Sequence, residues 1–391
     1  MKRRPRTNDG SHTVACRVPS PARRGRRAGP LPCMGIIAFA VACSSVAALA
    51  QNDAADAPGS PPDSAAQTGA AVDAVLETDH LGQLIDGPAR QAIDRGLAYL
   101  AASINDNGSW GSKNPRANTA TALLAFAADG HLPGSRSGSH GDVIDAGIAY
   151  LVNVGRQQDG FLGERGRGMY SHGLATLALA QLRGEITADE RSAAIDRALR
   201  QAVEVIVAAQ DKSGGWRYDP KPGQADLSVT VMQLAALRAA RHNGIDVSDA
   251  VIDSGLAYVR ACREKGGGYR YQPNQSGASY GRTAGAVALL LALDAGQASA
   301  ITESLQWLTD HRQQLDRNRR YSFYDRYYGG QAMLRAGPDR LAAWYPPVRD
   351  DLVRRQSDDG SWSADRGERP YATAMAVIVL TIPQRYLPMF N

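Results

Sequence analysis

The segment QDKSGGW, residues 210–216, combines a Gln, a polar turn, two glycines and a Trp, and this combination recurs along the chain. A second full copy is QSDDGSW at 356–362. Looser copies are NDNGSW at 105–110, QQDGF at 157–161 and KGGGYRY at 265–271. Successive copies up to the fourth are separated by roughly 50 residues, which is typical of repeat proteins.

Each copy lies between two helical patterns. The first helix is amphipathic, as in AIDRGLAYLAA (92–102), where apolar residues recur at i, i+3/i+4 and i+7. The second helix is almost wholly apolar. The second helices are expected at 118–128, 171–182, 226–240, 279–293, 327–336 and 371–380. The sequence therefore predicts six helix pairs and no strands.

Helices that alternate between amphipathic and apolar indicate two layers, with the apolar helices buried by the amphipathic ones. Six pairs can close into a ring, which removes the exposed end repeats that an open solenoid has to cap. We therefore predict an all-α fold, an α6/α6 toroid of six helix hairpins in two concentric layers, over residues 86–391. An open helical solenoid is the alternative.

The loop residues have structural roles in such a ring. The Gly allows a sharp turn, the aromatic side chain fills the wedge between neighbouring pairs, and the Gln bonds carbonyls left free at the helix end. In the fifth unit, RYSFYDRYY (320–328) stands at the equivalent place. Because the longer run DRNRRYSFYDRYY (316–328) mixes charges of both signs, we expect it to form a solvated rim.

The formal net charge of +5 is concentrated at the start of the chain. Residues 1–33 hold nine Lys or Arg against one acid, Asp9, so the rest of the chain is slightly acidic. A body without excess positive charge gives no electrostatic case for nucleic-acid binding. The basic stretch leads into an uncharged run at 34–50 that ends in Ala48-Leu49-Ala50, the small-residue pattern of a cleavage site.

Residues 1–50 are therefore predicted to be a signal peptide, and the protein is expected to be exported to the periplasm or the extracellular space. A twin-arginine signal at Arg26-Arg27 and a lipoprotein site at Cys43 are alternative export signals. The apolar run is too short for a membrane span, so none is expected after cleavage. Residues 51–85 are predicted to be a flexible linker. Since only Cys262 remains in the mature chain, stability has to come from packing.

The Gln-Trp loops resemble the Gln-Trp repeats of squalene and oxidosqualene cyclases. The six-pair layout is similar to the α/α toroid that these enzymes share with protein prenyltransferase β-subunits. The chain also resembles secreted bacterial prenyltransferase/squalene-oxidase repeat proteins, in which a stretch like ADLSVTVMQLAAL (225–237) follows the third loop. The resemblance covers residues 90–383. It implies the toroid fold and leaves the activity open.

The sequence departs from the catalytic motifs of these families. Cyclases of the squalene type protonate an alkene with an Asp-X-Asp-Asp motif, whereas RDD (349–351) and SDDG (357–360) fall in an outer helix and a loop. Prenyltransferases bind zinc through Asp, Cys and His, but Cys262 has no Asp or His at ligand spacing. No phosphate-binding glycine motif opens a helix after a strand. We therefore expect no metal and no cofactor.

In a closed ring, the starts of the inner helices face one mouth of the axial cavity, where a site is expected. Asp226 and His172 are the candidate catalytic residues, Asp226 as an acid whose pKa burial would raise and His172 as a base. Tyr rings would stabilise a cation through their faces. The candidate binding residues are Tyr170, Tyr280, Arg282, Tyr324, Tyr328 and Tyr371.

Each candidate also has a structural interpretation. A side-chain oxygen just before an apolar run caps free helix N–H groups and contributes about 1 kcal/mol. Residues in such positions are Asn118, Ser171, Asp226 and Ser279. On this interpretation His172 is a packed residue, Arg282 is a salt-bridge partner, and the tyrosines form a packed wall.

Three functions fit these residues. The first is a ring that binds a hydrophobic or carbohydrate small ligand in its axial cavity, and this is the function we expect. The second is a terpenoid or prenyl cyclase or isomerase that uses Asp226 as its acid. The third is a carbohydrate-active enzyme. A polysaccharide lyase would use a Tyr as base and Arg282 or His172 to neutralise a uronate, whereas a hydrolase would pair Asp226 with Asp219 or Asp325. The sequence does not predict an oligomeric state.

Overall fold

The recurring helix and loop pattern is present in the computed structural model. The structure describes residues 81–134, 140–166, 168–184, 186, 190–317, 321–363 and 367–385. These residues belong to one unit, Asp63–Asn391. Within the described residues all regular secondary structure is helical. The β-pairing there consists of isolated bridges, such as that between Ile104 and Trp110, which join the two sides of a loop. The predicted signal peptide and most of the predicted linker lie outside the described residues.

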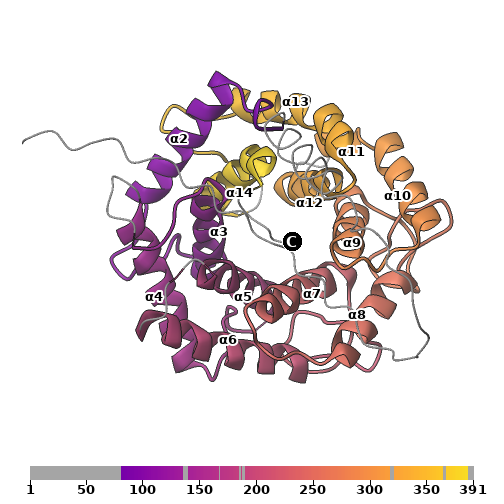
Figure 1. Cartoon of the computed structure of the whole chain (residues 1–391), viewed down its shortest axis with the longest axis horizontal. Coiled ribbons are helices and arrows are strands. Elements are labelled where there is room, and N and C mark those ends of the chain that lie inside the picture. Colours follow the sequence, from indigo (N-terminus) through magenta and orange to yellow (C-terminus); the bar gives the residue numbers. More distant parts are fainter. Residues whose placement is uncertain are drawn as a thin grey trace, which may run out of the picture. The chain divides into compact units, whose positions relative to one another are not determined.

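The helices form two concentric layers (Figure 1). The outer helices are α2 (Gly87–Ala102), α4 (Gly141–Gln157), α6 (Glu190–Ala208), α8 (Asp249–Ala261), α10 (Ala298–Asp310) and α13 (Pro338–Arg354). The inner helices are α3 (Pro115–Ala128), α5 (Met169–Arg183), α7 (Leu227–His242), α9 (Tyr280–Ala292), α12 (Ser322–Arg335) and α14 (Arg369–Thr381). Two short elements are α11 (Gln314–Arg317) and the 3-10 turn η2 (Ile382–Gln384).

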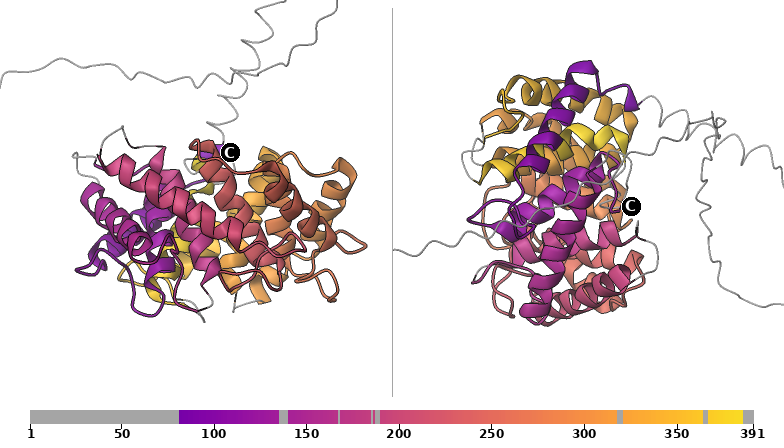
Figure 2. Two further views of the ribbon diagram at one scale, coloured as in Figure 1. Left: turned by 90° about the horizontal axis from the view of Figure 1, so that it is seen from below. Right: turned by 90° about the vertical axis from the view of Figure 1, so that its left-hand side faces the viewer.

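The ring is closed. Successive inner helices contact one another, and the last of them, α14, packs against the first, α3. In the outer layer the last helix, α13, likewise contacts the first, α2. Figure 2 shows the ring from two sides, with the hairpins crossing its thickness. The toroid prediction is confirmed, and the open solenoid is excluded for this part of the chain.

The burial of the two layers follows the sequence pattern. In α3 every residue from Asn118 to Ala128 is buried, and in α14 every residue from Ala372 to Thr381 is buried. The outer helix α2 buries one stripe only, including Ile93, Leu97 and Leu100. A helix that is apolar all round is stable only when it is enclosed, so these sequences belong to the inner layer.

The Trp makes the same two hydrogen bonds in each of the three repeat loops that carry one. The indole Nε1 of Trp216 donates to the carbonyl of Ile206 at 2.7 Å, and its backbone N–H donates to Thr230 Oγ1 on the inner helix at 3.0 Å. Trp110 and Trp362 repeat both bonds, with Thr119 and Thr373 as the inner-helix acceptors. Each loop thereby fastens the outer and inner helices of its pair.

The aromatic rings also pack against the next repeat. A Cβ built on Gly96 would lie 2.9 Å from the ring of Trp362, and one on Gly147 would lie 3.0 Å from the ring of Trp110. The contact between Gly255 and Trp216 is equivalent. The wedge role predicted for the aromatic residue is therefore correct. The aromatic ring packs directly against the Gly of the next outer helix, because this Gly has no side chain.

The Gln of the loop reaches further than expected. Gln210 Nε2 donates to the carbonyl of Gly214 in its own loop and to that of Val251 in α8 of the next repeat. Gln356 does the same with Gly360 and with Ala92 in α2. Each of these Gln side chains therefore joins neighbouring repeats, rather than only capping its own helix.

Two assignments within the repeat were wrong. The residue equivalent to Trp216 in the second unit is Leu162, two positions after the left-handed Gly160, and not Phe161. In the fifth unit, residues 322–328 do not form a solvated rim, because they are the first turns of the inner helix α12. Residues of this stretch that are buried include Asp325, Arg326, Tyr327 and Tyr328.

Glu368 joins the last repeat to the first. Its carboxylate accepts hydrogen bonds from the backbone N–H groups of Ser112 and Lys113, at 2.8 and 2.9 Å, and from Asn118 Nδ2 at 2.7 Å. Burial by itself would raise the pKa of Glu368, but these donors outweigh it and lower the pKa to about 2. The bonds are thus made to the charged form of the carboxylate.

Replacing Glu368 by Gln is expected to lower the free energy of unfolding at pH 7 by about 1–2 kcal/mol, because a neutral amide accepts these bonds less strongly. The contribution of the carboxylate is present above its unfolded pKa and is lost as the pH falls from about 4.5 toward 2. Urea unfolding of both proteins at pH 7 and pH 3 measures this. A difference between the two proteins that stays constant with pH would contradict the assignment.

Candidate functional site

Five tyrosines meet at the starts of three inner helices, and we call them the tyrosine cluster. They are Tyr170 of α5, Tyr324, Tyr327 and Tyr328 of α12, and Tyr371 of α14. The ring of Tyr328 lies edge-on to those of Tyr324 and Tyr327, with centroids 4.7 and 4.8 Å apart. The predicted gathering of Tyr170, Tyr324, Tyr328 and Tyr371 at one end of the inner layer is therefore observed.

The cluster has an accessible part and a buried part. Tyr170, Tyr324 and Tyr371 are partly exposed, whereas Tyr327 and Tyr328 are buried. Burial raises the pKa of every member, that of Tyr371 to about 12, so all five phenols are neutral at pH 7. Neutral phenol rings offer negative π faces without a full charge.

Asp226 is the N-cap of α7 and is fully buried. Its Oδ1 accepts a hydrogen bond from the backbone N–H of Val229 at 3.0 Å, so the predicted capping role is correct. Its Oδ2 has no hydrogen-bond partner and lies 4.0 Å from Arg217 Nε. Burial raises the pKa of Asp226, and the bond from Val229 only partly offsets this. One carboxylate oxygen thus caps the helix, and the other faces the guanidinium of Arg217 without a hydrogen bond.

Asp226 is coupled to the tyrosine cluster through Tyr324. The Tyr324 phenol interacts with Ser228, two residues after Asp226. Burial and the negative charges of Asp325 and Asp226 raise the pKa of Tyr324. Asp325 is itself buried and lies against the backbone of Gly281 at the start of α9. Two buried carboxyl groups therefore influence one partly exposed phenol.

Two tyrosine hydroxyls close to Asp226, those of Tyr218 and Tyr271, were not predicted from the sequence. The hydroxyls of Tyr218 and Tyr271 lie 2.7 Å apart, and burial together with Tyr218 and Asp226 raises the pKa of Tyr271. The sequence contains a pattern that could have revealed them. In WRYDP (216–220) and YRYQP (269–273) each of these tyrosines follows the aromatic residue of its repeat loop by two positions. Neighbouring repeats thus supply a pair of phenols next to one buried acid.

Two predicted binding residues make their contacts outside the tyrosine cluster. Tyr280 is buried, and its hydroxyl accepts a hydrogen bond from Trp344 Nε1 at 2.9 Å, so it joins α9 to the outer helix α13. Arg282 donates to the carbonyl of Gly277 at 2.8 Å, and its guanidinium lies 5.7 Å from the ring centre of Tyr271. Arg282 therefore belongs with the groups around Asp226, and Tyr280 belongs to the packing between helices.

His172 has a structural role. Its Nδ1 accepts the backbone N–H of Leu162 at 2.9 Å, and its Nε2 bonds the carbonyl of Ala202 at 3.1 Å. It thus takes the place that Thr119 and Thr230 have in their repeats. Because both ring nitrogens are bonded to backbone groups, the geometry does not support the predicted role of a catalytic base.

Acid is expected to destabilise the protein through His172. Burial lowers the pKa of this imidazole to about 4, below the value of about 6.5 in an unfolded chain. The contribution of neutral His172 to the free energy of unfolding is therefore complete above pH 6.5. It is lost as the pH falls toward 4, which lowers the free energy of unfolding by about 2–3 kcal/mol. Unfolding free energies between pH 7 and pH 4 should therefore fall more steeply for the natural protein than for His172→Thr. Parallel profiles would show that His172 does not titrate in this way.

The other predicted helix caps differ from Asp226. Asn118 and Ser171 lie inside their helices, and Ser279 stands at the N-cap of α9 without a side-chain hydrogen bond to it.

Among the described residues, no group of three or more His, Cys, Asp or Glu side chains is arranged to hold a metal ion. None of the helices described here is both long and apolar enough to cross a membrane.

No protein-family profile matches the chain. A drimenyl diphosphate synthase from Streptomyces showdoensis is 26% identical over 193 residues, a stretch that spans 48% of this chain and 34% of that enzyme. A solved structure of a protein from Actinoplanes superposes with a TM-score of 0.51 at 16% identity and covers 76% of this chain and 99% of its own.

A substituted form of the type II terpene cyclase MstE from Scytonema, in complex with geranylgeranyl dihydroxybenzoate, superposes equally well. Its TM-score is 0.51 at 17% identity, over 77% of this chain and 98% of the cyclase. At such identities the superposition shows the fold alone. The described part of this chain is an α/α toroid of the squalene-cyclase and prenyltransferase-like class, with type II terpene cyclases among the proteins that share its fold.

Proposed function

We propose that this protein binds a prenyl-type hydrophobic ligand at the tyrosine cluster. The observation that carries the proposal is the gathering of Tyr170, Tyr324 and Tyr371, all partly exposed, where three inner helices begin. The middle turns of α3, α7 and α14 are buried, so the accessible aromatic surface lies at this end of the inner layer. The MstE complex with a geranylgeranyl ligand supports this ligand class.

Binding is tested by titrating the purified protein with farnesol and geranylgeraniol and following its intrinsic fluorescence. Tyr324→Ala is expected to weaken binding at least tenfold, because it removes a partly exposed ring that packs on Tyr328. The control is Tyr321→Ala, which removes a surface tyrosine just before the same helix and should leave the affinity unchanged. Equal affinities for all three proteins would refute the proposal.

A second candidate function is protonation of the bound ligand by Asp226, as a cyclase or isomerase would require. The Oδ2 without a hydrogen-bond partner and the raised pKa favour it, because burial makes the carboxyl group easier to protonate and so brings it closer to the role of a proton donor. The sequence around it, Asp226-Leu227-Ser228-Val229, has only the first acid of an Asp-X-Asp-Asp pattern. Asp226 would therefore have to act without neighbouring acids in that pattern.

Asp226→Asn separates the acid role from the capping role. An Asn caps a helix about as well as an Asp, so the melting temperature should stay within about 2 °C, while any conversion of squalene or geranylgeraniol is lost. Asp86→Asn is the matched control, because Asp86 caps α2 with the same bond, from Ala89 N–H at 2.9 Å. Activity should also fall as the pH rises through the pKa of Asp226. Full turnover by Asp226→Asn would exclude this function.

The polysaccharide alternative has less support. A hydrolase needs two carboxyl groups that face a common substrate, but Asp226 and Asp325 are both buried. Asp219 lies in the loop 217–224, beside Arg217 and Lys221. Phenol rings, not carboxylates, form the accessible surface of the cluster.

We also propose export of the protein to the periplasm or the extracellular space. The support is the pattern of residues 1–50, a basic stretch followed by an uncharged apolar run and Ala48-Leu49-Ala50. Expression of the full chain followed by fractionation and N-terminal sequencing tests it, with Gln51 as the expected first residue. Recovery of an uncleaved chain in the cytoplasm would contradict it.

A further inference from the structure

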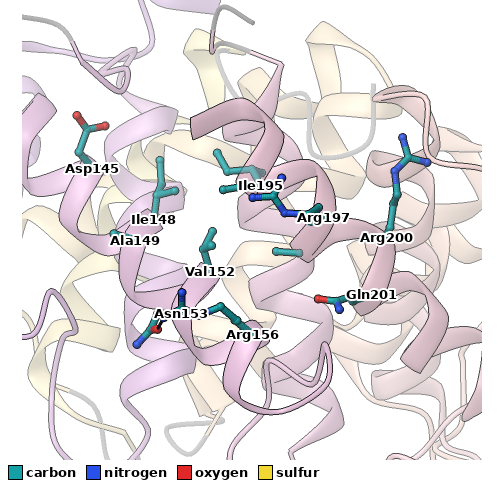
Figure 3. A pocket seen from close by; sticks show the side chains of 12 residues that line it. Asp145, Ile148, Ala149, Val152, Asn153, Arg156, Ile195, Arg197, Arg200 and Gln201 are labelled. Atoms are coloured by element: carbon teal, nitrogen blue, oxygen red, sulfur yellow. Dashed lines mark hydrogen bonds between the residues drawn. The ribbon is translucent and has the colours of Figure 1, made fainter. Parts of the chain in front are cut away.

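A groove of about 750 Å³ lies on the outside of the ring, between α4 and α6 (Figure 3). Its lining is aliphatic at the centre. The apolar residues are Ile148, Ala149 and Val152 from α4 and Ala194, Ile195 and Ala198 from α6. The groove belongs to the outer layer, whereas the tyrosine cluster belongs to the inner layer, so this site is separate from the one proposed above.

The groove coincides with a change in the repeat. At three other junctions a Trp rests on a Gly of the next outer helix, as Trp216 rests on Gly255. At this junction the wedge is Leu162, which packs on Gly155, and Ala198 stands close by. A Leu side chain fills much less volume than a Trp, and α4 and α6 contact each other directly at this junction, with Ala198 of α6 reaching both Leu162's neighbour Gly155 and the groove.

The rim of the groove is positively charged. Arg156, Arg197 and Arg200 line it against a single carboxylate, Asp145. Arg156 donates to the neutral amide oxygen of Asn153 at 2.8 Å, and this bond does not compensate its charge. Figure 3 shows the guanidinium of Arg197 beside Ile195, with Arg200 further along α6. Positive charge thus borders an apolar floor.

We propose that this groove binds a single-chain amphiphile, an alkyl or isoprenoid chain that ends in a carboxylate or phosphate group. The volume lies in the range of small-molecule sites, about 300–1,000 Å³. The lining offers no Trp or Tyr, the residues that most often anchor protein partners, so a flexible chain fits it better than a docked protein. The guanidinium groups would pair with the anionic head.

The test is calorimetric titration of the purified full chain with dodecanoate and dodecyl phosphate below their critical micelle concentrations. Both anions are expected to bind, and the tighter of the two identifies the head group. Dodecylammonium, which has the same chain and the opposite charge, should bind at least tenfold more weakly. Tyr324→Ala should leave dodecanoate binding unchanged, because that residue belongs to the inner site.

Two variants place the ligand in the groove. The double change Arg197→Glu and Arg200→Glu reverses the charge of the rim, and Ala149→Trp fills the groove from an exposed position. Each should weaken dodecanoate binding at least tenfold. The control is Arg340→Glu, which reverses an exposed Arg on α13 outside the groove and should change the affinity less than twofold.

Unchanged dodecanoate affinity in both groove variants would overturn the proposal. Equal affinities for dodecanoate and dodecylammonium would overturn it as well, because they would show that the arginines do not select the head group. A synthetic acidic amphipathic helix that binds here, together with no binding of either anion, would instead identify a surface for a protein partner. Circular dichroism of every variant establishes that loss of binding is not loss of folding.

Discussion

Replacing Trp362 by alanine is expected to lower the free energy of unfolding by about 3–5 kcal/mol. The side chain is almost completely buried, and its Nε1 donates to the carbonyl of Leu352 at 2.8 Å. Its ring rests on Gly96 of α2, so it fills the wedge at which the last repeat meets the first. The loss combines the burial of a large aromatic group, the cavity left behind and a carbonyl without its donor.

Urea unfolding followed by circular dichroism measures this loss, and Trp307→Ala is the matched control. Trp307 is also on the outer layer, but it is partly exposed and stacks on His311, with ring centroids 3.9 Å apart. Its removal is expected to cost less than about 1.5 kcal/mol. If the two variants were equally stable, the closure of the ring would not depend on the Trp362 wedge.

Gly214→Ala is expected to lower the free energy of unfolding by about 2–5 kcal/mol. Two effects add: the left-handed φ of 91°, which costs a residue with a Cβ about 1–2 kcal/mol, and overlap with the next repeat, which costs about 1–3 kcal/mol. A Cβ at this position would lie 2.1 Å from the carbonyl oxygen of Ser254 in α8. The backbone of the loop can approach α8 only because residue 214 has no side chain.

The control for this prediction is Gly223→Ala in the nearby loop 217–224. Gly223 is exposed, has no positive φ and has no atom within 4 Å of the place where a Cβ would lie. Its substitution should change the free energy of unfolding by less than about 0.5 kcal/mol. Thermal and urea unfolding of both variants measure the contrast. A Gly214 variant as stable as the Gly223 variant would show that close packing of the loop is not required.

The fold was predictable because the same helix pair and the same loop recur several times in the sequence. The alternation of amphipathic and apolar helices assigns the two layers, and QDKSGGW marks the turn between them. Where one copy is degenerate, the neighbouring copies still define the pattern. The errors fell on the degenerate copies. QQDGF was aligned by its aromatic residue, Phe161, although the backbone turn is set by Gly160, which places Leu162 in the wedge.

The fifth unit shows a second limit. RYSFYDRYY contains charges of both signs, and such a run is usually solvated, yet it forms the first turns of α12. Arg326 is buried there because Asp351 of α13 lies 2.9 Å away. The partner is 25 residues distant in sequence, so local patterning cannot reveal that the charge is compensated.

The candidate site was predicted in part for the same reason. Tyr170, Tyr324 and Tyr371 follow directly from the starts of the inner helices, because closure brings those starts together. Tyr280 starts an inner helix too, but its hydroxyl is used by Trp344 of α13. The position along a helix is a local property, whereas the direction of a side chain depends on which neighbour offers it a partner.

The sequence by itself determined the number of helix pairs, their two layers and the loop that joins them, because hydrophobic period and turn chemistry are local and are repeated. Only the tertiary structure decided that the ring closes through Trp362 and Glu368, that one oxygen of Asp226 has no hydrogen-bond partner, and that a groove lies between α4 and α6. Each of these depends on the volume and polarity of residues far apart in the chain, which become neighbours only when all the hairpins are packed together.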